Sequence, residues 1–557
     1  MAAPSIALRP SPTDIARAAA AAMPAEVSTK PLLGILGVVT GAGVVTLTSR
    51  MISLGLPDFR GLHGFGYDES AWIGTAFDVG LMFIGPFTVY LGGLMGPRRI
   101  LLTAAALFTM LLIFLPFVHS YSLVIALVLL GGLTSGTFYP LTLTFALRRI
   151  PLRYLPFTLA LYATFVDGAV NIAPSLYGWY RDHLSSNWMF WNSAAITPLM
   201  MICIYYGIPK TESAKKAGKA PSFAGFLYAS VGLAMLLAAL EQGERLDWWR
   251  SGVFNALFAG GAFFVLCALV RRLFGPNPLV ALPYLRNWNT VLLGTLLFWF
   301  RFTLCTTIIL IPQSLAIRGF EPDQIGPAII WSAIPLIPVA FVAGLLLLRR
   351  LDSRLLFAAG LSCTALAAWL NSLYSSTWAA QNFYRTELLT GVGQAFSFIG
   401  LVGCIVLEAI FTGALAKPER ALTFSAYFHT IRIFGGTAGA IYMGHFLAQR
   451  EKLHSNLLGL HVRSGNWITD QNIHAMTASL YAKSYGLAAA GARSVDLIAA
   501  RLRLQAYSLS IIDGLLLIAW SCACALILVA LLRKSLLNYG DLSAIQQTLI
   551  AEKESKS

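Results

Sequence analysis

Residues 70–118 read SAWIGTAFDVGLMFIGPFTVYLGGLMGPRRILLTAAALFTMLLIFLPFV, and this stretch decides the fold. Two apolar runs, 70–95 and 100–118, stand on either side of the short basic turn GPRR at 96–99. A helix needs about 20 apolar residues to cross a bilayer, and only regular structure pairs the backbone amides that lipid cannot hydrogen-bond. The stretch therefore predicts two antiparallel transmembrane helices joined by a tight loop.

The same pattern repeats along the whole chain. Apolar runs of comparable length occupy 32–56, 70–95, 100–118, 122–147, 155–180, 189–208, 223–240, 252–270, 289–316, 326–348, 355–373, 386–415, 422–448 and 509–532. Each run approaches or exceeds the length that spans a membrane as a helix. We therefore expect an all-α membrane protein with about fourteen transmembrane helices.

The composition excludes most soluble classes. The 557 residues are 57% hydrophobic and only 12% charged, whereas a soluble domain carries roughly 25% charged residues. The formal charge of +15 comes from basic pairs between apolar runs, which is the positive-inside pattern and not a nucleic-acid surface. The seven cysteines lie within apolar runs without metal-ligand spacing, so we expect no metal and no other cofactor.

The basic residues also predict the orientation. With the N-terminus in the cytoplasm, the inner segments hold about four times as many Lys and Arg residues as the short outer loops. Because basic residues favour the cytoplasmic side, we expect both termini in the cytoplasm of a bacterial cell and a multi-pass location in the inner membrane. The first apolar run is too long for a cleaved signal peptide.

Two breaks in the pattern divide the chain. A polar linker follows the sixth run, and a long polar segment, 449–508, precedes the last run. Within it, 494–504 has the spacing of a helix lying on the membrane or of an ordered loop helix. Six helices, two inserted helices and six more give the expected domains: a tail 1–31, a bundle 32–208, a linker with inserted helices 209–288, a bundle 289–532 and a tail 533–557.

Local motifs then resemble the fourteen-helix drug/proton antiporter branch of the major facilitator superfamily, of EmrB/QacA type. The resemblance covers nearly the whole chain from about residue 32, and its main elements lie in the first half. The turn Gly96-Pro97-Arg98-Arg99 matches the end of the family's first loop motif, although Gly93 stands where an acidic residue is expected. The segment 173–179 (APSLYGW), with Pro174 and Gly178, resembles the antiporter motif of helix five.

Further motifs lie at 56–58 (LPD), 72–77 (WIGTAF), 188–192 (WMFWN), 344–354, 432–436 (RIFGG) and 505–513. The resemblance implies the major facilitator fold, with two six-helix bundles around a central path. It also implies that Gly96, Arg98, Arg99, Pro174 and Gly178 serve conformational change.

Several ionisable residues fall inside the apolar runs, where each needs a partner or a water-filled cavity. Arg50 and Asp78 lie at similar depths on adjacent helices, so they are candidates for an ion pair, either functional or static. Asp167 lies near mid-membrane, and Asn171 follows one turn later on the same face. We expect Asp167 to be the best candidate for proton coupling, with a buried structural anchor as the alternative, and Asp78 as its competitor.

Three more positions complete the set of candidates. The resemblance places Arg301 and Arg432 near the substrate path, together with Arg50 and Asn171, although an arginine that only holds the bundle together has the same signature. Glu408 and His429 lie at similar depths on helices adjacent in sequence, and a carboxylate beside an imidazole can relay protons. The alternative for His429 is an interfacial residue.

These observations predict an efflux transporter, with proton-coupled antiport of amphipathic small molecules by alternating access. The alternative is a proton-independent facilitator or importer of the same fold. No catalytic constellation with intramembrane spacing occurs, so we expect no enzyme. The expected partners are a small-molecule substrate and the lipid bilayer, with a periplasmic adaptor and an outer-membrane channel as further candidates; no nucleic acid is expected.

Overall fold

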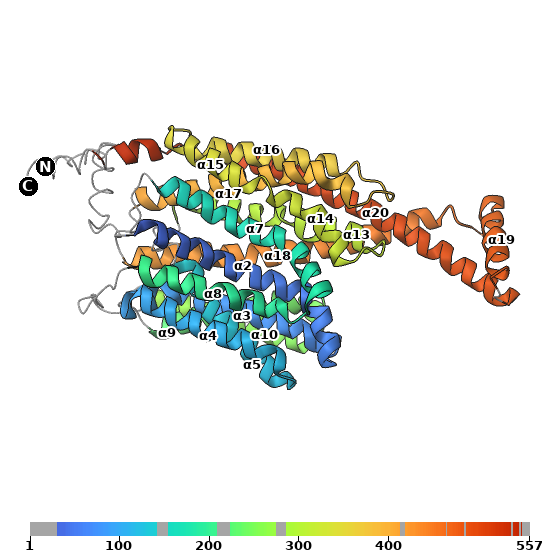
Figure 1. The fold of residues 1–557 in the computed structure, drawn as a ribbon, viewed down its shortest axis with the longest axis horizontal. Helices are drawn as coiled ribbons and strands as arrows, with labels where there is room; N and C mark the ends of the chain where they lie inside the picture. Colours follow the sequence, from blue (N-terminus) through green and yellow to red (C-terminus); the bar gives the residue numbers. More distant parts are fainter. Residues whose placement is uncertain are drawn as a thin grey trace, which may run out of the picture.

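The computed structural model describes residues 30–141, 154–208, 223–274, 286–412, 418–463, 465–483, 486–535, 538–544 and 547. In this part of the chain the regular structure is helical, and the long helices run side by side along one axis (Figure 1). The predicted all-α membrane fold with about fourteen transmembrane helices is confirmed. The predicted linker 209–222 and both chain termini lie outside the described residues.

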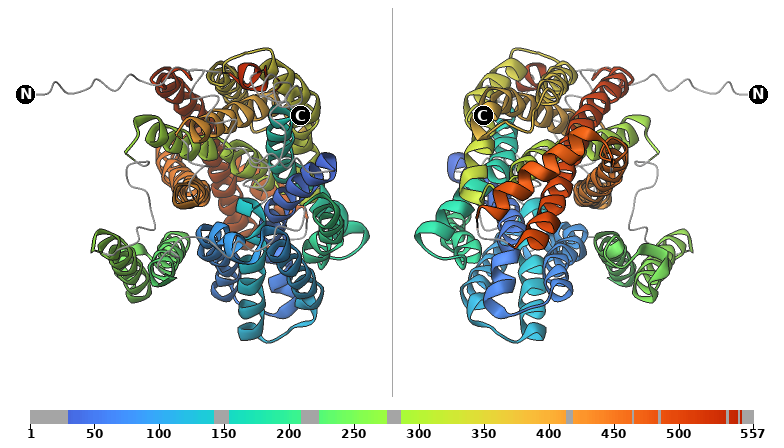
Figure 2. Two further views of the ribbon diagram at one scale, coloured as in Figure 1. Left: turned by 90° about the vertical axis from the view of Figure 1, so that its left-hand side faces the viewer. Right: turned by 90° about the vertical axis from the view of Figure 1, so that its right-hand side faces the viewer.

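The described residues of the first half, 30–141 and 154–208, form six long helices and one short 3₁₀ turn. They are α2 (Pro31–His63), α3 (Tyr67–Met95), α4 (Pro97–Phe114), η1 (Leu115–Phe117), α5 (Tyr121–Ser135), α7 (Leu155–His183) and α8 (Trp188–Gly207). Two further helices follow, α9 (Phe223–Gly243) and α10 (Gly252–Phe274), with η2 (Trp248–Arg250) between them. Figure 2 shows α9 and α10 as a separate green pair at the side of the bundle, where α9 packs against α3.

The second half has a less regular first span. It begins with α12 (Trp288–Thr303), the π-helix η3 (Thr306–Leu310) and α13 (Ile311–Ala316), and continues with α14 (Pro322–Ala333), α15 (Leu336–Leu348), α16 (Ser353–Asn371), η4 (Ala380–Phe383), α17 (Tyr384–Phe411), α18 (Pro418–Gly459), α19 (Trp467–Tyr481) and α20 (Leu487–Ala530). A π-helical turn widens the backbone spiral, which exposes carbonyl groups and often marks a functional site.

Helix α18 differs from the other spans in composition. Thirteen helices in the part of the chain described here are long and apolar enough to cross a membrane, and α18 is not among them. It carries His429 and Arg432, both almost fully buried, and packs against α3, α9, α12 and α20. A span surrounded by other helices can keep polar groups away from lipid, so its low apolar content fits a position inside the bundle.

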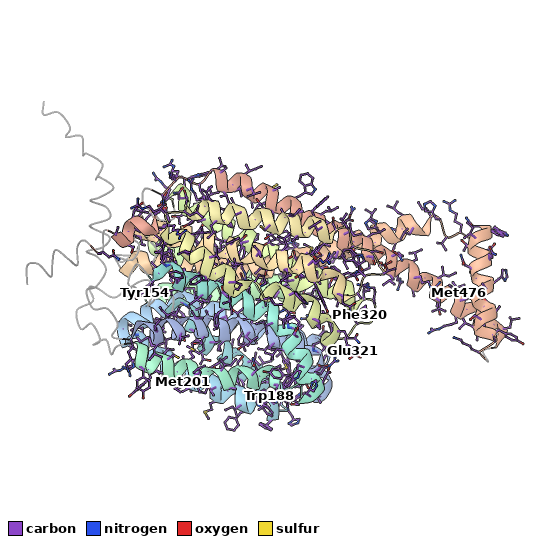
Figure 3. The ribbon with its side chains drawn as sticks, turned by 45° about the horizontal axis from the view of Figure 1, so that its top comes forward. Tyr154, Trp188, Met201, Phe320, Glu321 and Met476 are labelled. Carbon is purple, nitrogen blue, oxygen red and sulfur yellow. The ribbon has the colours of Figure 1, made fainter. Side chains whose placement is uncertain are left out.

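The long outer segment is more helical than its sequence suggested. Helix α18 continues to Gly459, and the last helix begins at Leu487, far before the apolar run that starts at residue 509. The segment 494–504 is therefore part of α20 and not a separate helix on the membrane. Good helix formers without proline let the helix continue beyond the bilayer. Figure 3 shows Met476, on α19, well beyond the end of the bundle at which Glu321 lies.

Candidate functional site

A cavity of about 680 Å³ lies between the two halves of the molecule. Its walls come from α2, α3 and α9 on one side and from α12, η3 and α18 on the other. Tyr67, Glu244 and Arg245 line the mouth, at the helix ends predicted to face outward. Asp78, Arg301 and Arg432 line the inner part. The cavity thus reaches from one surface to mid-membrane depth.

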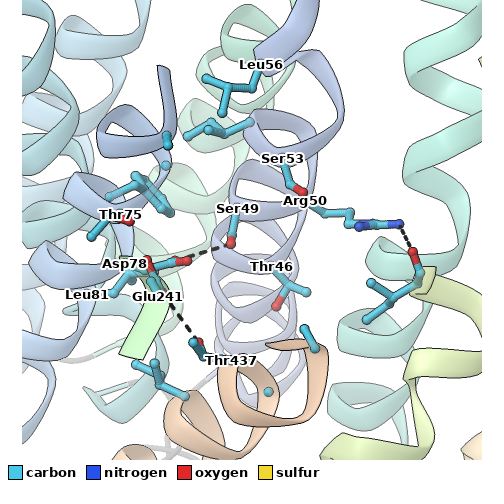
Figure 4. Close-up of a pocket in the computed structure, with 18 of the residues that line it drawn as sticks. Thr46, Ser49, Arg50, Ser53, Leu56, Thr75, Asp78, Leu81, Glu241 and Thr437 are labelled. Atoms are coloured by element: carbon cyan, nitrogen blue, oxygen red, sulfur yellow. Dashed lines mark hydrogen bonds between the residues drawn. The ribbon is translucent and has the colours of Figure 1, made fainter. Parts of the chain in front are cut away.

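Two carboxyl groups meet inside the cavity (Figure 4). Asp78 of α3 accepts a hydrogen bond from the Ser49 hydroxyl at 3.4 Å. Glu241 of α9 lies beside Asp78 and accepts a hydrogen bond from the Thr437 hydroxyl of α18 at 3.5 Å. Because two neighbouring carboxyl groups repel each other when both are ionised, their proximity favours a proton on one of them. The pair is therefore a candidate for holding a proton.

Glu241 is the functional candidate that sequence reasoning missed. It directly follows the apolar run 223–240, so the predicted helix boundary places it in an outer loop. In the structure α9 continues to Gly243. The neighbouring Gln242 donates to the Thr75 hydroxyl at 2.7 Å and to the Ala71 carbonyl at 3.1 Å, which fixes α9 on α3. The adjacent polar pair Glu241-Gln242 at the end of an apolar run was the available signal.

The predicted ion pair between Arg50 and Asp78 is not formed. Arg50 donates to the carbonyl of Ile308, in the π-helix of the other half, at 3.1 Å. Figure 4 shows its side chain directed away from the two acids. Successive residues of a helix point about 100° apart, so Ser49 faces Asp78 while Arg50 faces the opposite half. Equal depth on adjacent helices was not sufficient for contact.

Arg301 and Arg432 come together from α12 and α18. The guanidinium of Arg432 lies over the ring of Tyr139, 3.6 Å from its centre. The guanidinium of Arg301 lies against Gly436 of α18, where an added β-carbon would be 3.0 Å from its Nη2 atom. Both arginines line the cavity. Neither forms an ion pair with a carboxylate within 4 Å in the described parts of the chain.

Asp167 and Asn171 lie outside the cavity wall. Asn171 donates to the side-chain carbonyl of Gln394 in α17 at 2.8 Å, and Gln394 donates to Thr307 at 3.3 Å. Asn171 lies on the same face as Asp167 but forms no hydrogen bond with it. Asp167 is 1% exposed, its oxygens have no hydrogen-bond partner, and it interacts with Arg301 through charge. Asn171 pairs with Gln394 in the opposite half instead of with Asp167 along α7.

Glu408 and His429 do not meet either. Glu408 accepts hydrogen bonds from the side-chain amides of Asn287 and Asn289, beside the start of α12. His429 is 3% exposed and its Nε2 lies 3.3 Å from the Leu81 carbonyl of α3, beside Gly85. The relay fails because α17 packs on α16 whereas α18 packs on α3, so helices adjacent in sequence do not bring these side chains together.

The segment 96–99 contains the turn between α3 and α4, and the segment 173–179 lies in α7. Gly96 joins α3 to α4 with a φ of 87°, a conformation that favours glycine. The guanidinium of Arg98 lies 4.4 Å from the centre of the Tyr205 ring, and Arg99 is exposed. Pro174 and Gly178 lie in α7, which crosses α14 so closely that an added β-carbon on Gly178 would be 2.7 Å from the backbone of Asp323.

Two helical bundles around a cavity that is lined by charged groups of membrane-spanning helices are typical of a membrane transporter. Residues 38–440 match the Major Facilitator Superfamily, and the chain belongs to this family. Probable multidrug resistance protein EmrY of Escherichia coli (strain K12) is 23% identical over 424 residues, covering 74% of this chain and 79% of the relative. Fatty acid resistance protein FarB of Neisseria gonorrhoeae is 23% identical over 425 residues, covering 75% and 80%.

A solved structure supports the same fold. The proton:xylose symporter XylE, bound to 6-bromo-6-deoxy-D-glucose, superposes with a TM-score of 0.55 at 10% identity and covers 93% of this chain and 99% of its own. This similarity shows the fold alone. The family match and the relatives confirm the resemblance to the drug-efflux branch that the sequence motifs indicated.

Proposed function

We propose that this chain exports small molecules across the inner membrane in exchange for protons, by alternating access of its two halves. The observation that carries this proposal is the Asp78–Glu241 pair, which lines a cavity between the halves at membrane depth. A group that holds a proton beside a substrate path can release it to one side and reload it from the other. Substrate and proton then use the same cavity in alternation.

The structure also contains contacts that a rocking motion would break. At the mouth end, Arg181 of α7 forms an ion pair with Glu321 and lies 3.9 Å from Asp323 of α14. Midway, Arg50 bridges the halves through the Ile308 carbonyl. Exposed ion pairs contribute little stability, so the Arg181–Glu321 ion pair can open and close at a small cost in free energy.

The names of the relatives favour export over import. EmrY is named for multidrug resistance, FarB for fatty acid resistance, and CmcT of Amycolatopsis lactamdurans for cephamycin export. Resistance and export both require outward transport. The proton-independent facilitator or importer is not favoured, because the cavity holds an acid pair that such a protein does not need.

Inverted membrane vesicles test the proposed function. Energised vesicles acidify their interior, so a proton-coupled exporter should accumulate substrate inside them. We expect accumulation of at least one of ethidium, tetraphenylphosphonium and 4-phenylbutyrate, and its loss when an uncoupler collapses the gradient. Vesicles without the protein are the control. Equilibration of the substrate without accumulation, unaffected by the uncoupler, would indicate a facilitator, and accumulation only in right-side-out vesicles would indicate an importer.

We further propose that both termini face the cytoplasm, so that α19 projects into the periplasm. In a cysteine-free variant, Asn472→Cys on α19 should react with an impermeant thiol reagent added outside the cell. Lys534→Cys, after the end of α20, should react only after the membrane is opened; both native side chains are exposed. The reverse labelling would overturn the orientation. A periplasmic adaptor and an outer-membrane channel stay further candidate partners.

A further inference from the structure

Three arginines reach the cavity with unpaired nitrogen atoms. Arg50 comes from α2, Arg301 from α12 and Arg432 from α18. The buried atoms Nε of Arg50, Nε and Nη1 of Arg301, and Nε of Arg432 have no hydrogen-bond partner. Buried polar groups in native proteins are nearly always paired, so each unpaired one needs an explanation. An unpaired guanidinium inside a membrane is especially costly.

The charged groups at the mouth of the same cavity behave differently. Arg245 donates to the Asp68 carboxylate at 2.6 Å and to the Gln242 side chain at 2.6 Å. Glu244 lies 3.2 Å from the His445 ring nitrogen. Charges at the entrance are therefore satisfied within the protein, whereas those at the inner end are not. Among the described residues that line the cavity, unpaired guanidinium nitrogens therefore occur on Arg50, Arg301 and Arg432 and not at the mouth.

The acids nearby do not neutralise the three arginines. Asp78 and Glu241 contribute about one negative charge between them, because neighbouring carboxyl groups do not readily ionise together. Asp78 interacts with Arg432 and Arg301 through charge but forms no ion pair with either. Asp167 lies behind the cavity wall and interacts with Arg301 by charge alone. None of these three acids lies within 4 Å of a nitrogen of the three arginines, all within the described ranges. Positive charge therefore remains in excess at the inner end.

The rest of the wall is suited to an apolar body. Apolar side chains such as Ile52, Leu56, Phe77, Ile308 and Ile433 also line the cavity. A volume of about 680 Å³ lies in the range of drug-sized ligand sites. Guanidinium groups match the geometry of carboxylates and bind them through paired hydrogen bonds.

We infer that the cavity binds an amphipathic organic anion, with its carboxylate held by Arg301 and Arg432 and its apolar body directed toward the mouth. The inference deepens the proposed function by naming the substrate class, but binding of the anion needs no proton gradient. A binding measurement can therefore fail while transport succeeds, and the reverse.

The test uses the purified full chain in phosphatidylcholine nanodiscs and three probes with the same body. These are 4-phenylbutyrate, 4-phenylbutanol and (4-phenylbutyl)trimethylammonium, with binding measured by calorimetry. We expect the carboxylate to bind at least about tenfold more tightly than the alcohol, as a charge-assisted hydrogen bond would produce, and the ammonium compound to bind least. Equal binding of the three probes, or tighter binding of the ammonium compound, would overturn the inference.

Variants then assign the binding to the inner end. Arg301→Gln and Arg432→Gln should each weaken 4-phenylbutyrate binding by at least about tenfold and leave the alcohol unchanged. Arg250→Gln, an exposed arginine outside the cavity lining, is the matched control and should bind the carboxylate normally. Unchanged carboxylate binding in both inner variants would contradict the inference. If neither variant folds, the comparison of the three probes on the unmodified chain still tests whether the cavity prefers an anion.

A second nanodisc composition separates a free carboxylate from a lipid headgroup. Phosphatidylglycerol carries an anionic headgroup that could occupy the same arginines. We expect 4-phenylbutyrate to bind equally well in nanodiscs with and without this lipid. If 4-phenylbutyrate binds only in nanodiscs without phosphatidylglycerol, the lipid headgroup occupies the arginines of the inner end. That result would overturn the inference.

Discussion

Glu241→Gln is expected to reduce proton-driven export by about a hundredfold, the scale on which loss of a proton-transferring group often acts. The amide keeps the size of the side chain and can still accept the hydrogen bond from Thr437, but it cannot release a proton. The variant should therefore fold, insert and bind substrate in the absence of a gradient. Gradient-driven accumulation in inverted vesicles and gradient-free binding to purified protein measure the two properties separately.

Glu244→Gln is the matched control for this variant. It removes a carboxylate from the same helix end, but Glu244 lies at the mouth, half exposed and paired with His445, so export should stay within about twofold of normal. Asp78→Asn should resemble Glu241→Gln. The double variant should be no worse than either single one, because residues that act as a unit are not additive. Normal gradient dependence in Glu241→Gln would return proton coupling to Asp167, the candidate favoured by the sequence.

Gly178→Leu should shift the balance between the two states of the transporter by about tenfold or more. An added β-carbon at Gly178 would lie 2.7 Å from the backbone of Asp323, and one at Gly326 would lie 2.5 Å from that of Ser175. Overpacking of such a contact costs about 1–3 kcal/mol. Because α7 and α14 belong to different halves, the cost falls on the state in which they touch and not on either bundle alone.

Cross-linking measures this shift. Cysteines at Arg181 and Glu321, which form an ion pair across the crossing, should be linked readily by a short bifunctional reagent in the otherwise unmodified chain. Gly178→Leu should reduce the yield and reduce export in parallel. Gly61→Leu is the control, since an added β-carbon there meets nothing within 4 Å. Full cross-linking and full export in Gly178→Leu would show that the crossing does not regulate the states.

Part of the site was accessible from the sequence, and part was not. Asp78, Arg301 and Arg432 stand out as charges within apolar runs, and the structure places all three on the cavity wall. Asp167 stands out equally, yet it lies behind the wall. Glu241 does not stand out, because its helix extends past the apolar run on which the boundary was placed. The position of a charged residue within an apolar run thus indicated its depth in the membrane, but not whether its side chain faces the cavity.

The sequence by itself determined the helices, their order and the family. Each apolar run must by itself be long enough to span the bilayer and must pair its own backbone hydrogen-bonding groups. Its length and composition can therefore be interpreted without knowing which helices pack beside it. Contacts between side chains are not local. Arg50 misses Asp78 because successive residues turn by about 100° around a helix, and His429 misses Glu408 because α18 packs on α3 instead of α17. Only the packing of helices distant in sequence decided which charges share the cavity, because side-chain direction and helix neighbours are set by the whole bundle.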